Sequence, residues 1–297
     1  MPDPFVSLVA APYFGWNLIN DGAELLRYPF MRHAFAAGTI VAIVAGLIGY
    51  FVVLRGSSFA AHALSHIGFA GATGALLVGV TPLLGLLVFT GAAGAAMGAL
   101  GGRRLRGRDV TIGIVLAWAL GLGVLFLSLY RGFAQQAYGI LFGEILGITV
   151  RDVLVTLGAG AVTLLALAVI YRPLLFASID EEVAEAKGVP VQALSIIFML
   201  VLAVAVSEAV QVVGVLLIFA LVVTPAAIAE RLAARPVHAM GLAALLALAF
   251  TWVGLTMAYY LPYPVSFFIT STAFLGYVLV RAVPAIAAFR RGVRRRG

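Results

Sequence analysis

The chain has 297 residues, of which 63% are hydrophobic and 10% are charged. A soluble domain has about 45–50% apolar and about 25% charged residues, so one soluble core cannot bury this excess and the composition predicts a polytopic membrane protein. The absence of cysteine excludes disulfides and thiolate metal sites. The formal net charge of +7 does not indicate a nucleic-acid partner, because the basic residues lie in short loops and in a C-terminal tail.

Apolar stretches of about 20 residues, the length that crosses a bilayer, recur along the chain. They predict an all-α fold with about eight to nine transmembrane helices. We place nine spans at residues 34–54, 59–79, 82–102, 112–130, 150–172, 190–207, 211–229, 238–260 and 265–284. A further apolar segment, "AYGILFGEILGIT" (137–149), is too short to cross alone and is expected to be a re-entrant or broken helix.

The arginine-rich loop "GGRRLRGRD" (101–109) orients the chain, because short cytoplasmic loops of membrane proteins are enriched in Arg and Lys. Counting spans from this loop also places residues 173–189 in the cytoplasm. We expect an external or interfacial N-terminal segment 1–33, a membrane domain 34–284 and a basic cytoplasmic tail 285–297. No G-x-x-x-x-G-K-[ST] motif is present, so any hydrolysis of ATP would belong to another chain.

Residues 178–188 form a charged segment between two apolar spans. Ser178 followed three residues later by Glu181 is the pattern of a capping box, and Gly188 before Pro190 is a helix-stop signal. This spacing predicts a short, exposed, capped helix on the cytoplasmic side. The segment is either a solvated connector or a docking element for a partner protein.

Two of the four histidines lie close together in "SSFAAHALSHIGFAGATG" (57–74). His62 and His66 are four residues apart and therefore share one face of a helix. Neutral imidazole is the commonest metal ligand and suits zinc, and ionisable side chains inside a membrane usually face a bundle interior or a water-filled path. The spacing is compatible with a divalent-metal site and also with two structural histidines that hydrogen-bond to neighbouring helices.

Three carboxylates lie near predicted membrane depth, and two of them are candidates to supply oxygen ligands. Glu144 belongs to the short segment 137–149, and Glu208 falls at a predicted external turn, where a solvated side chain is favoured. Asp152 begins a span and is expected to cap it. A two-histidine site needs further ligands, and Glu144 or Glu208 would complete it.

Several sequence blocks in order resemble one family, the integral-membrane permease of ABC transporters for zinc and manganese. The blocks extend from about Tyr28 to Pro284 and are "YPFMRHAFAAG", "GYFVVLRGSSF", "HALSHIGFAG", "DVTIGIV", "LFGEIL", "IDEEVAEAKGVPV", "VVGVLLIFALVVTPAAIAER" and "LPYPVSFFI". The block "HALSHIGFAG" is similar to the family's Asp-x-x-x-His motif, which is followed five residues later by Gly. Aligned on Gly71, the family histidine falls on His66 and the family aspartate falls on His62.

The resemblance implies a permease of the type II ABC importer kind in the bacterial cytoplasmic membrane, acting as a transport subunit and not as an enzyme. It implies a homodimer, two cytoplasmic ATPase subunits, an external metal-binding protein and surrounding lipid, with no permanently bound cofactor. His66 would be a metal ligand on the transport path, with His62, Glu144 and Glu208 as further candidates. The ATPase-coupling residues would be Asp180, Glu181, Glu182, Ala184, Lys187 and Gly188.

His62 departs from the family motif, because histidine replaces a hard anionic oxygen ligand by a neutral nitrogen. Manganese prefers oxygen ligands and zinc accepts nitrogen readily, so the substitution predicts that zinc is preferred over manganese. Two alternatives are a permease for a metal chelate, such as a siderophore or cobalamin, and a metal carrier that ATP does not drive. An intramembrane metalloprotease is disfavoured, because Ala-Leu-Ser between the histidines lacks the Glu of H-E-x-x-H.

Overall fold

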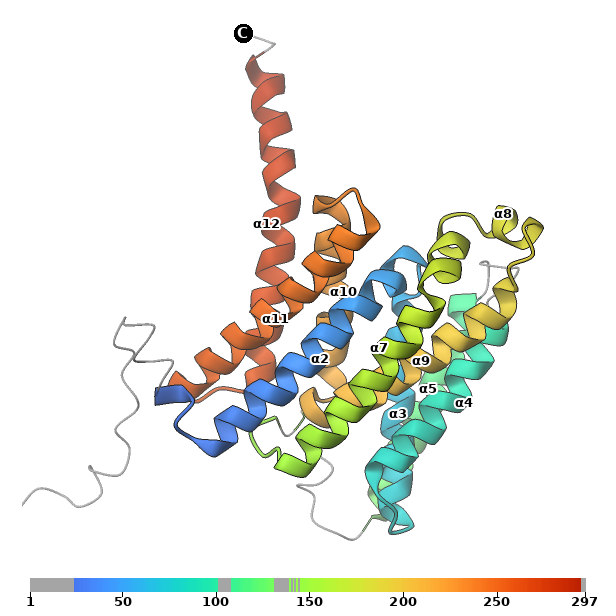
Figure 1. Cartoon of the computed structure of the whole chain (residues 1–297). Helices are drawn as coiled ribbons and strands as arrows, with labels where there is room; N and C mark the ends of the chain where they lie inside the picture. The colour runs from blue at the N-terminus through green and yellow to red at the C-terminus, as the bar shows by residue number, and fades with distance from the viewer. Residues whose placement is uncertain are drawn as a thin grey trace, which may run out of the picture.

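The structure is a computed structural model that describes residues 24–100, 108–130, 139, 141, 143 and 145–294, with side chains placed as far as residue 282. All the regular secondary structure among these residues is α-helical, and most of the long helices lie side by side in one bundle (Figure 1). The helices are α2 (Pro29–Leu54), α3 (Ser58–Leu77), α4 (Pro82–Leu100), α5 (Arg108–Leu129), α7 (Val150–Ile179), α8 (Glu181–Ala186), α9 (Val191–Val213), α10 (Val215–Leu232), α11 (Pro236–Tyr260) and α12 (Val265–Arg294). The predicted all-α membrane fold is confirmed, and each predicted span overlaps one long helix.

Among the described residues, eight helices are long and apolar enough to cross a membrane, and α3 is not one of them. The histidines, serines and glycines of α3 lower its hydropathy. This helix is instead enclosed by protein, because it packs against α4, α5, α9 and α10 and most of its residues are buried. A helix that meets little lipid does not need a fully apolar surface.

Two predicted helix ends differ from the structure. The helix predicted to end at residue 172 continues through Pro173 to Ile179 as α7, which membrane helices tolerate where neighbouring groups satisfy the freed carbonyl. The turn predicted near residues 208–210 is absent, because α9 continues to Val213 and α10 begins at Val215. Gly214 alone makes this break, with φ +83° and ψ 162°, a region that is essentially restricted to glycine.

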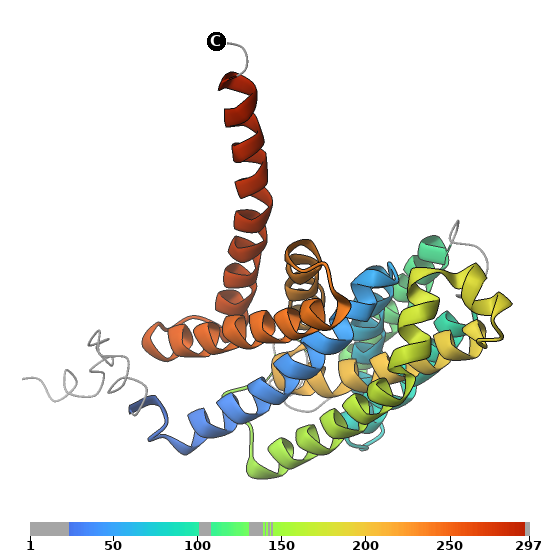
Figure 2. The ribbon, with the colours of Figure 1, turned by 45° about the horizontal axis from the view of Figure 1, so that its top comes forward.

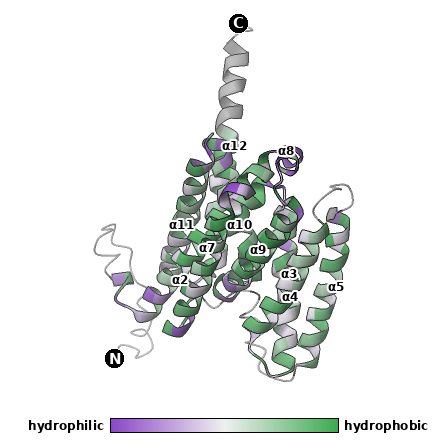
Figure 3. Ribbon diagram, turned by 45° about the vertical axis from the view of Figure 1, so that its right-hand side comes forward, coloured by the Kyte–Doolittle hydropathy of each residue, from purple (hydrophilic) through white to green (hydrophobic). Residues whose placement is uncertain are grey.

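The two ends of the bundle carry different elements. The short helix α8, the turn between α2 and α3 and the C-terminal end of α12 lie at one end, and the turn between α3 and α4 lies at the other (Figures 1 and 2). The second half of α12 extends beyond the other helices (Figure 2). Hydrophilic residues gather on α8 and near helix ends, whereas hydrophobic residues predominate along the helices (Figure 3).

Candidate functional site

The first three turns of α3 hold the two histidines in direct contact. The ring centroids of His62 and His66 are 4.5 Å apart at an interplanar angle of 76°. The ring of Phe219 from α10 lies 5.1 Å from the His62 ring, at 72°. The four-residue spacing therefore brings the imidazoles together as predicted, and a residue more than 150 positions away closes one side of the pair.

His62 leaves one polar atom unsatisfied inside the bundle. Its Nδ1 is buried and has no hydrogen-bond partner. Nearly all buried polar atoms in native proteins have a partner, so such an atom calls for an explanation, for example a ligand. The neighbouring Ser65 hydroxyl is occupied elsewhere, because it donates to the backbone carbonyl of His62 at 2.8 Å. At least one nitrogen of the pair, the Nδ1 of His62, therefore has no hydrogen-bond partner in the surrounding helices.

A single copy does not complete a closed metal site with these histidines. Among the described residues, no group of three or more His, Cys, Asp or Glu side chains has the arrangement to hold a metal ion. Structural zinc sites use four protein ligands. A pair of imidazoles that binds an ion with the help of water or a second subunit suits transient binding better than permanent binding.

Glu208 lies inside α9, where the predicted external turn is absent, and its side chain is only 6% exposed. The expectation that it is solvated is therefore wrong. Ser207 and Glu208 interrupt an apolar run and so favour a turn, yet α9 buries both residues against its neighbours. Glu208 is not grouped with the histidines in one metal-holding cluster.

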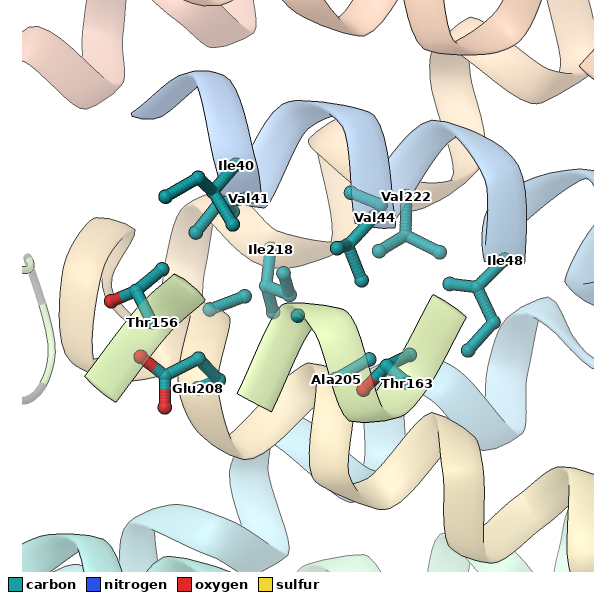
Figure 4. Close-up of a pocket in the computed structure, with 13 residues that line it drawn as sticks. Ile40, Val41, Val44, Ile48, Thr156, Thr163, Ala205, Glu208, Ile218 and Val222 are labelled. Carbon is teal, nitrogen blue, oxygen red and sulfur yellow. The ribbon is translucent and has the colours of Figure 1, made fainter. Parts of the chain in front are cut away.

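Two neighbouring cavities share Glu208 and Thr156 in their walls. The larger one, of about 260 Å³, lies between the ends of α3, α4, α7 and α9, and is also lined by Asp152 and Gln211. The smaller one lies between α2, α7, α9 and α10 and holds about 10 Å³, the space of roughly one water molecule. Figure 4 shows Glu208 and Thr156 at one end of the smaller cavity and aliphatic side chains along α2 and α10.

Asp152 has the capping role that its position predicts. The Thr149 hydroxyl donates to its carboxylate at 2.6 Å, and the Thr149 backbone N–H donates to the same oxygen at 3.0 Å. This capping box begins α7. The same carboxylate also lines the larger cavity together with Glu208, so two acidic side chains face one hollow at the predicted external end.

A polar contact that sequence reasoning missed links α4 and α9 beside this cavity. The hydroxyls of Thr90 and Ser207 are 2.7 Å apart and both residues are fully buried. Thr90 also lies against Gly68, two residues after His66, where an added Cβ would meet its methyl group at 2.9 Å. Threonine and serine are common in membrane helices, so nothing in their local sequence pointed to this contact.

The predicted charged helix is present as α8, and its exposure is confirmed. Its cap is Asp180, whose carboxylate accepts from the backbone N–H of Val183 at 3.0 Å. Ser178, the predicted cap, instead belongs to the last turn of α7, because α7 continues beyond Pro173. Most of α8 is exposed, whereas Ala184 is fully buried. The remaining predicted coupling residues, Glu181, Glu182, Lys187 and Gly188, are all exposed.

Glu144, the other candidate oxygen ligand, lies outside the described residues, as do positions 137, 138, 140 and 142 of the predicted broken segment 137–149. The described part of that segment makes a turn at residues 145–147. Gly143 there has φ +77°, the left-handed region that favours glycine.

This helical bundle, with a histidine pair inside it and a capped charged helix at one end, is the architecture of a membrane transport subunit. The sequence pattern of the ABC 3 transport family matches residues 27–283, and the chain belongs to this family. The resemblance to metal ABC transporter permeases is thereby confirmed, as is a multi-pass location in the bacterial cytoplasmic membrane.

Curated relatives cover most of the chain. The manganese transport system membrane protein MntC of Halalkalibacterium halodurans is 34% identical over 219 residues, which are 74% of this chain and 75% of the relative. The manganese import system permease protein ScaB of Streptococcus parasanguinis is 32% identical over 209 residues, which are 70% of this chain and 74% of the relative.

Solved structures share the fold. PsaBC from Streptococcus pneumoniae, solved in complex with Fab, has a chain that aligns with a TM-score of 0.79 and 29% identity, over 89% of this chain and 95% of the other. A metal-chelate type ABC transporter in an inward-facing conformation aligns with a TM-score of 0.67 at 16% identity, over 91% of this chain and 89% of the other. The second likeness concerns the fold alone.

Proposed function

We propose that this chain is the permease subunit of an ATP-driven importer that carries a divalent transition-metal ion, zinc in preference to manganese. The observation that carries the proposal is the contact between His62 and His66 inside the bundle, with the buried Nδ1 of His62 left without a partner. An ABC importer also needs an ATPase, which we assign to separate cytoplasmic subunits, and an external metal-binding protein.

A second copy of the chain would supply the missing ligands. Histidines from two copies, with water in a remaining position, would bind zinc in an open site from which the ion can leave. Both imidazoles are only partly buried in the single chain, which leaves them accessible to a partner subunit. We therefore propose a homodimer with the histidine pairs facing each other across the transport path.

The acidic residues serve a different part of the path in this proposal. Glu208 and Asp152 line the larger cavity at the predicted external end. Carboxylates there would attract a cation from outside before it reaches the histidines. Oxygen ligands hold divalent ions less selectively than nitrogen ligands hold zinc, so selection would occur at His62 and His66.

The preference for zinc rests on the nitrogen ligand at position 62. MntC and ScaB, two relatives of this chain, carry manganese in their names, and the family motif has an aspartate where this chain has His62. An imidazole in place of a carboxylate removes an oxygen ligand that manganese favours. In this proposal, the residue at position 62 therefore decides between zinc and manganese.

The test is metal uptake by a bacterial strain that lacks its own zinc and manganese importers and carries this permease with its ATPase and binding protein. We expect zinc uptake by the wild type and a loss of about tenfold or more for His66→Ala, because an inner ligand is removed. The matched control is His238→Ala, which removes an exposed histidine from α11. Full uptake by a well-expressed His66→Ala variant would mean that the histidines are structural, and uptake of a chelate in place of the free ion would favour a chelate permease.

A further inference from the structure

Arg55 occupies the junction between α2 and α3, at the same end of the bundle as α8. It is the C-terminal cap of α2, and α3 begins three residues later at Ser58. Its Nη1 donates a hydrogen bond to the Ser178 hydroxyl at 3.2 Å. Its guanidinium carbon lies 5.6 Å from the ring centroid of Phe198 in α9. One side chain thus contacts the last turn of α7 and the helix that follows α8.

Arg55 contacts the residue that leads into α8 on one side and the interior of α9 on the other. Ser178 is two residues before Asp180, whose carboxylate caps α8, and Phe198 is fully buried within α9, which follows α8 in the chain. Ser178 is itself held in place, because its hydroxyl donates to the backbone carbonyl of Leu174. A displacement of α8 relative to the bundle would therefore act first on Ser178, while Phe198 holds Arg55 against α9.

The backbone that follows Arg55 forms a tight turn that leads into α3. The backbone N–H of Ser57 donates to the carbonyl of Val52 at 2.8 Å, and the Ser57 hydroxyl donates to the Arg55 carbonyl at 3.4 Å. Gly56 makes the tight turn with φ +61°. His62 is the fifth residue of α3, about one helical turn after Ser58, so the turn from Arg55 leads directly into the part of α3 that carries the histidines.

From this geometry we propose that Arg55 is a positioning residue that joins the base of α8 to the helix that bears the histidine pair. Movement that the ATPase imposes on α8 would pass through Ser178 to Arg55, and from there to the first turns of α3. The proposal rests on the proposed function, because it assigns to α8 the contact with the ATPase.

Arginine can make both contacts at this position, the hydrogen bond to Ser178 and the contact with the Phe198 ring, in a way that lysine cannot. A planar guanidinium donates hydrogen bonds in its plane while its face lies over an aromatic ring, whereas an ammonium is a point charge on a flexible stem. Arg55→Lys therefore keeps the positive charge and loses the combined contact. Ser178→Ala removes the hydroxyl acceptor and leaves the contact with Phe198.

The experiment uses the complete complex of permease, ATPase and binding protein in liposomes, and measures ATP hydrolysis and metal uptake in the same sample. For Arg55→Lys and Arg55→Ala we expect ATP hydrolysis to continue while the number of ions moved per ATP falls about tenfold, since a hydrogen bond from a charged donor and a cation–π contact are lost together. Ser178→Ala should show a smaller loss. The control is Arg172→Ala, an exposed arginine on α7.

A second measurement does not depend on the transported ion. The chain has no cysteine, so spin labels at Phe59→Cys in α3 and Glu185→Cys in α8 report the separation of these helices before and after ATP is added. In the protein that keeps Arg55 we expect a narrow distance distribution that does not change when ATP is added. In Arg55→Ala we expect a broader distribution that changes with ATP. Identical distributions, or an unchanged ratio of ions to ATP, would overturn the role of Arg55. A wild-type complex that moves no metal while these distributions differ would refute the proposed cargo and leave the role of Arg55 supported.

Discussion

At position 62, on the proposed transport path, the residue type decides whether a nitrogen or an oxygen ligand is offered to the ion. In the family motif as it aligns with this chain, position 62 holds an aspartate and position 66 a histidine. The structure places the imidazoles of both positions side by side, with centroids 4.5 Å apart. Any ion that contacts one of them is therefore close to the other. A nitrogen or an oxygen ligand at position 62 would then change which ion binds more tightly.

Replacing His62 by Asp should shift the preference of the transporter toward manganese. We expect the ratio of initial manganese uptake to zinc uptake to rise about tenfold in His62→Asp, because a carboxylate oxygen suits manganese better than an imidazole does. The measurement is uptake of each ion alone at matched expression. An unchanged ratio would remove position 62 from the selection of the ion, and an exposed substitution such as His238→Asp supplies the control.

At the scale of helices, a glycine contact sets how closely α3 and α4 approach. A Cβ added at Gly71 would lie 2.2 Å from the carbonyl oxygen of Gly85, and one added at Gly85 would lie 2.0 Å from the carbonyl oxygen of Gly71. Small residues let membrane helices pack backbone to backbone. This contact lies on the helix that carries the histidines, so it also sets their distance from α4.

Gly71→Ala should destabilise the protein by about 1–3 kcal/mol, because the backbones must separate to admit a methyl group. The readout is the thermal unfolding midpoint of the purified permease in detergent. Gly91→Ala is the matched control on α4, since an added Cβ there meets nothing within 4 Å, and its midpoint should stay the same or rise slightly. Equal midpoints for the two variants would contradict the close approach of α3 and α4.

For the molecule as a whole, the arrangement of charge predicts which end faces the cytoplasm. The arginine-rich loop 101–109, the charged helix α8 and the basic tail 285–297 follow spans that end on the same side. The turn between α3 and α4, which contains Val80, lies at the opposite end (Figure 1). The larger cavity with Asp152 and Glu208 lies near that opposite end, since Leu76 and Pro82 also line it.

Cysteine labelling tests this orientation without background, because the chain has no cysteine of its own. A membrane-impermeant maleimide should label Val80→Cys in intact cells and Glu185→Cys only after the membrane is opened. Both side chains are exposed in the structure. Labelling of Glu185→Cys from outside would invert the orientation and refute the contact of α8 with a cytoplasmic ATPase.

The amino-acid sequence by itself determined the membrane class, the succession of long apolar helices and the shared face of His62 and His66. These properties depend on local composition and on the helical period, both of which are readable over about 20 residues. Helix ends were less predictable, because Pro173 and Glu208 look like interruptions in isolation and are accommodated by neighbouring helices.

Only the tertiary structure decided which distant residues meet. The hydroxyls of Thr90 and Ser207 are 117 residues apart in the chain, and the partners Arg55 and Ser178 are 123 residues apart. Phe219 reaches His62 from α10 in the same way. Such contacts depend on how whole helices pack, because each partner is an ordinary residue in its own helix and gains its role from the surface that another helix presents.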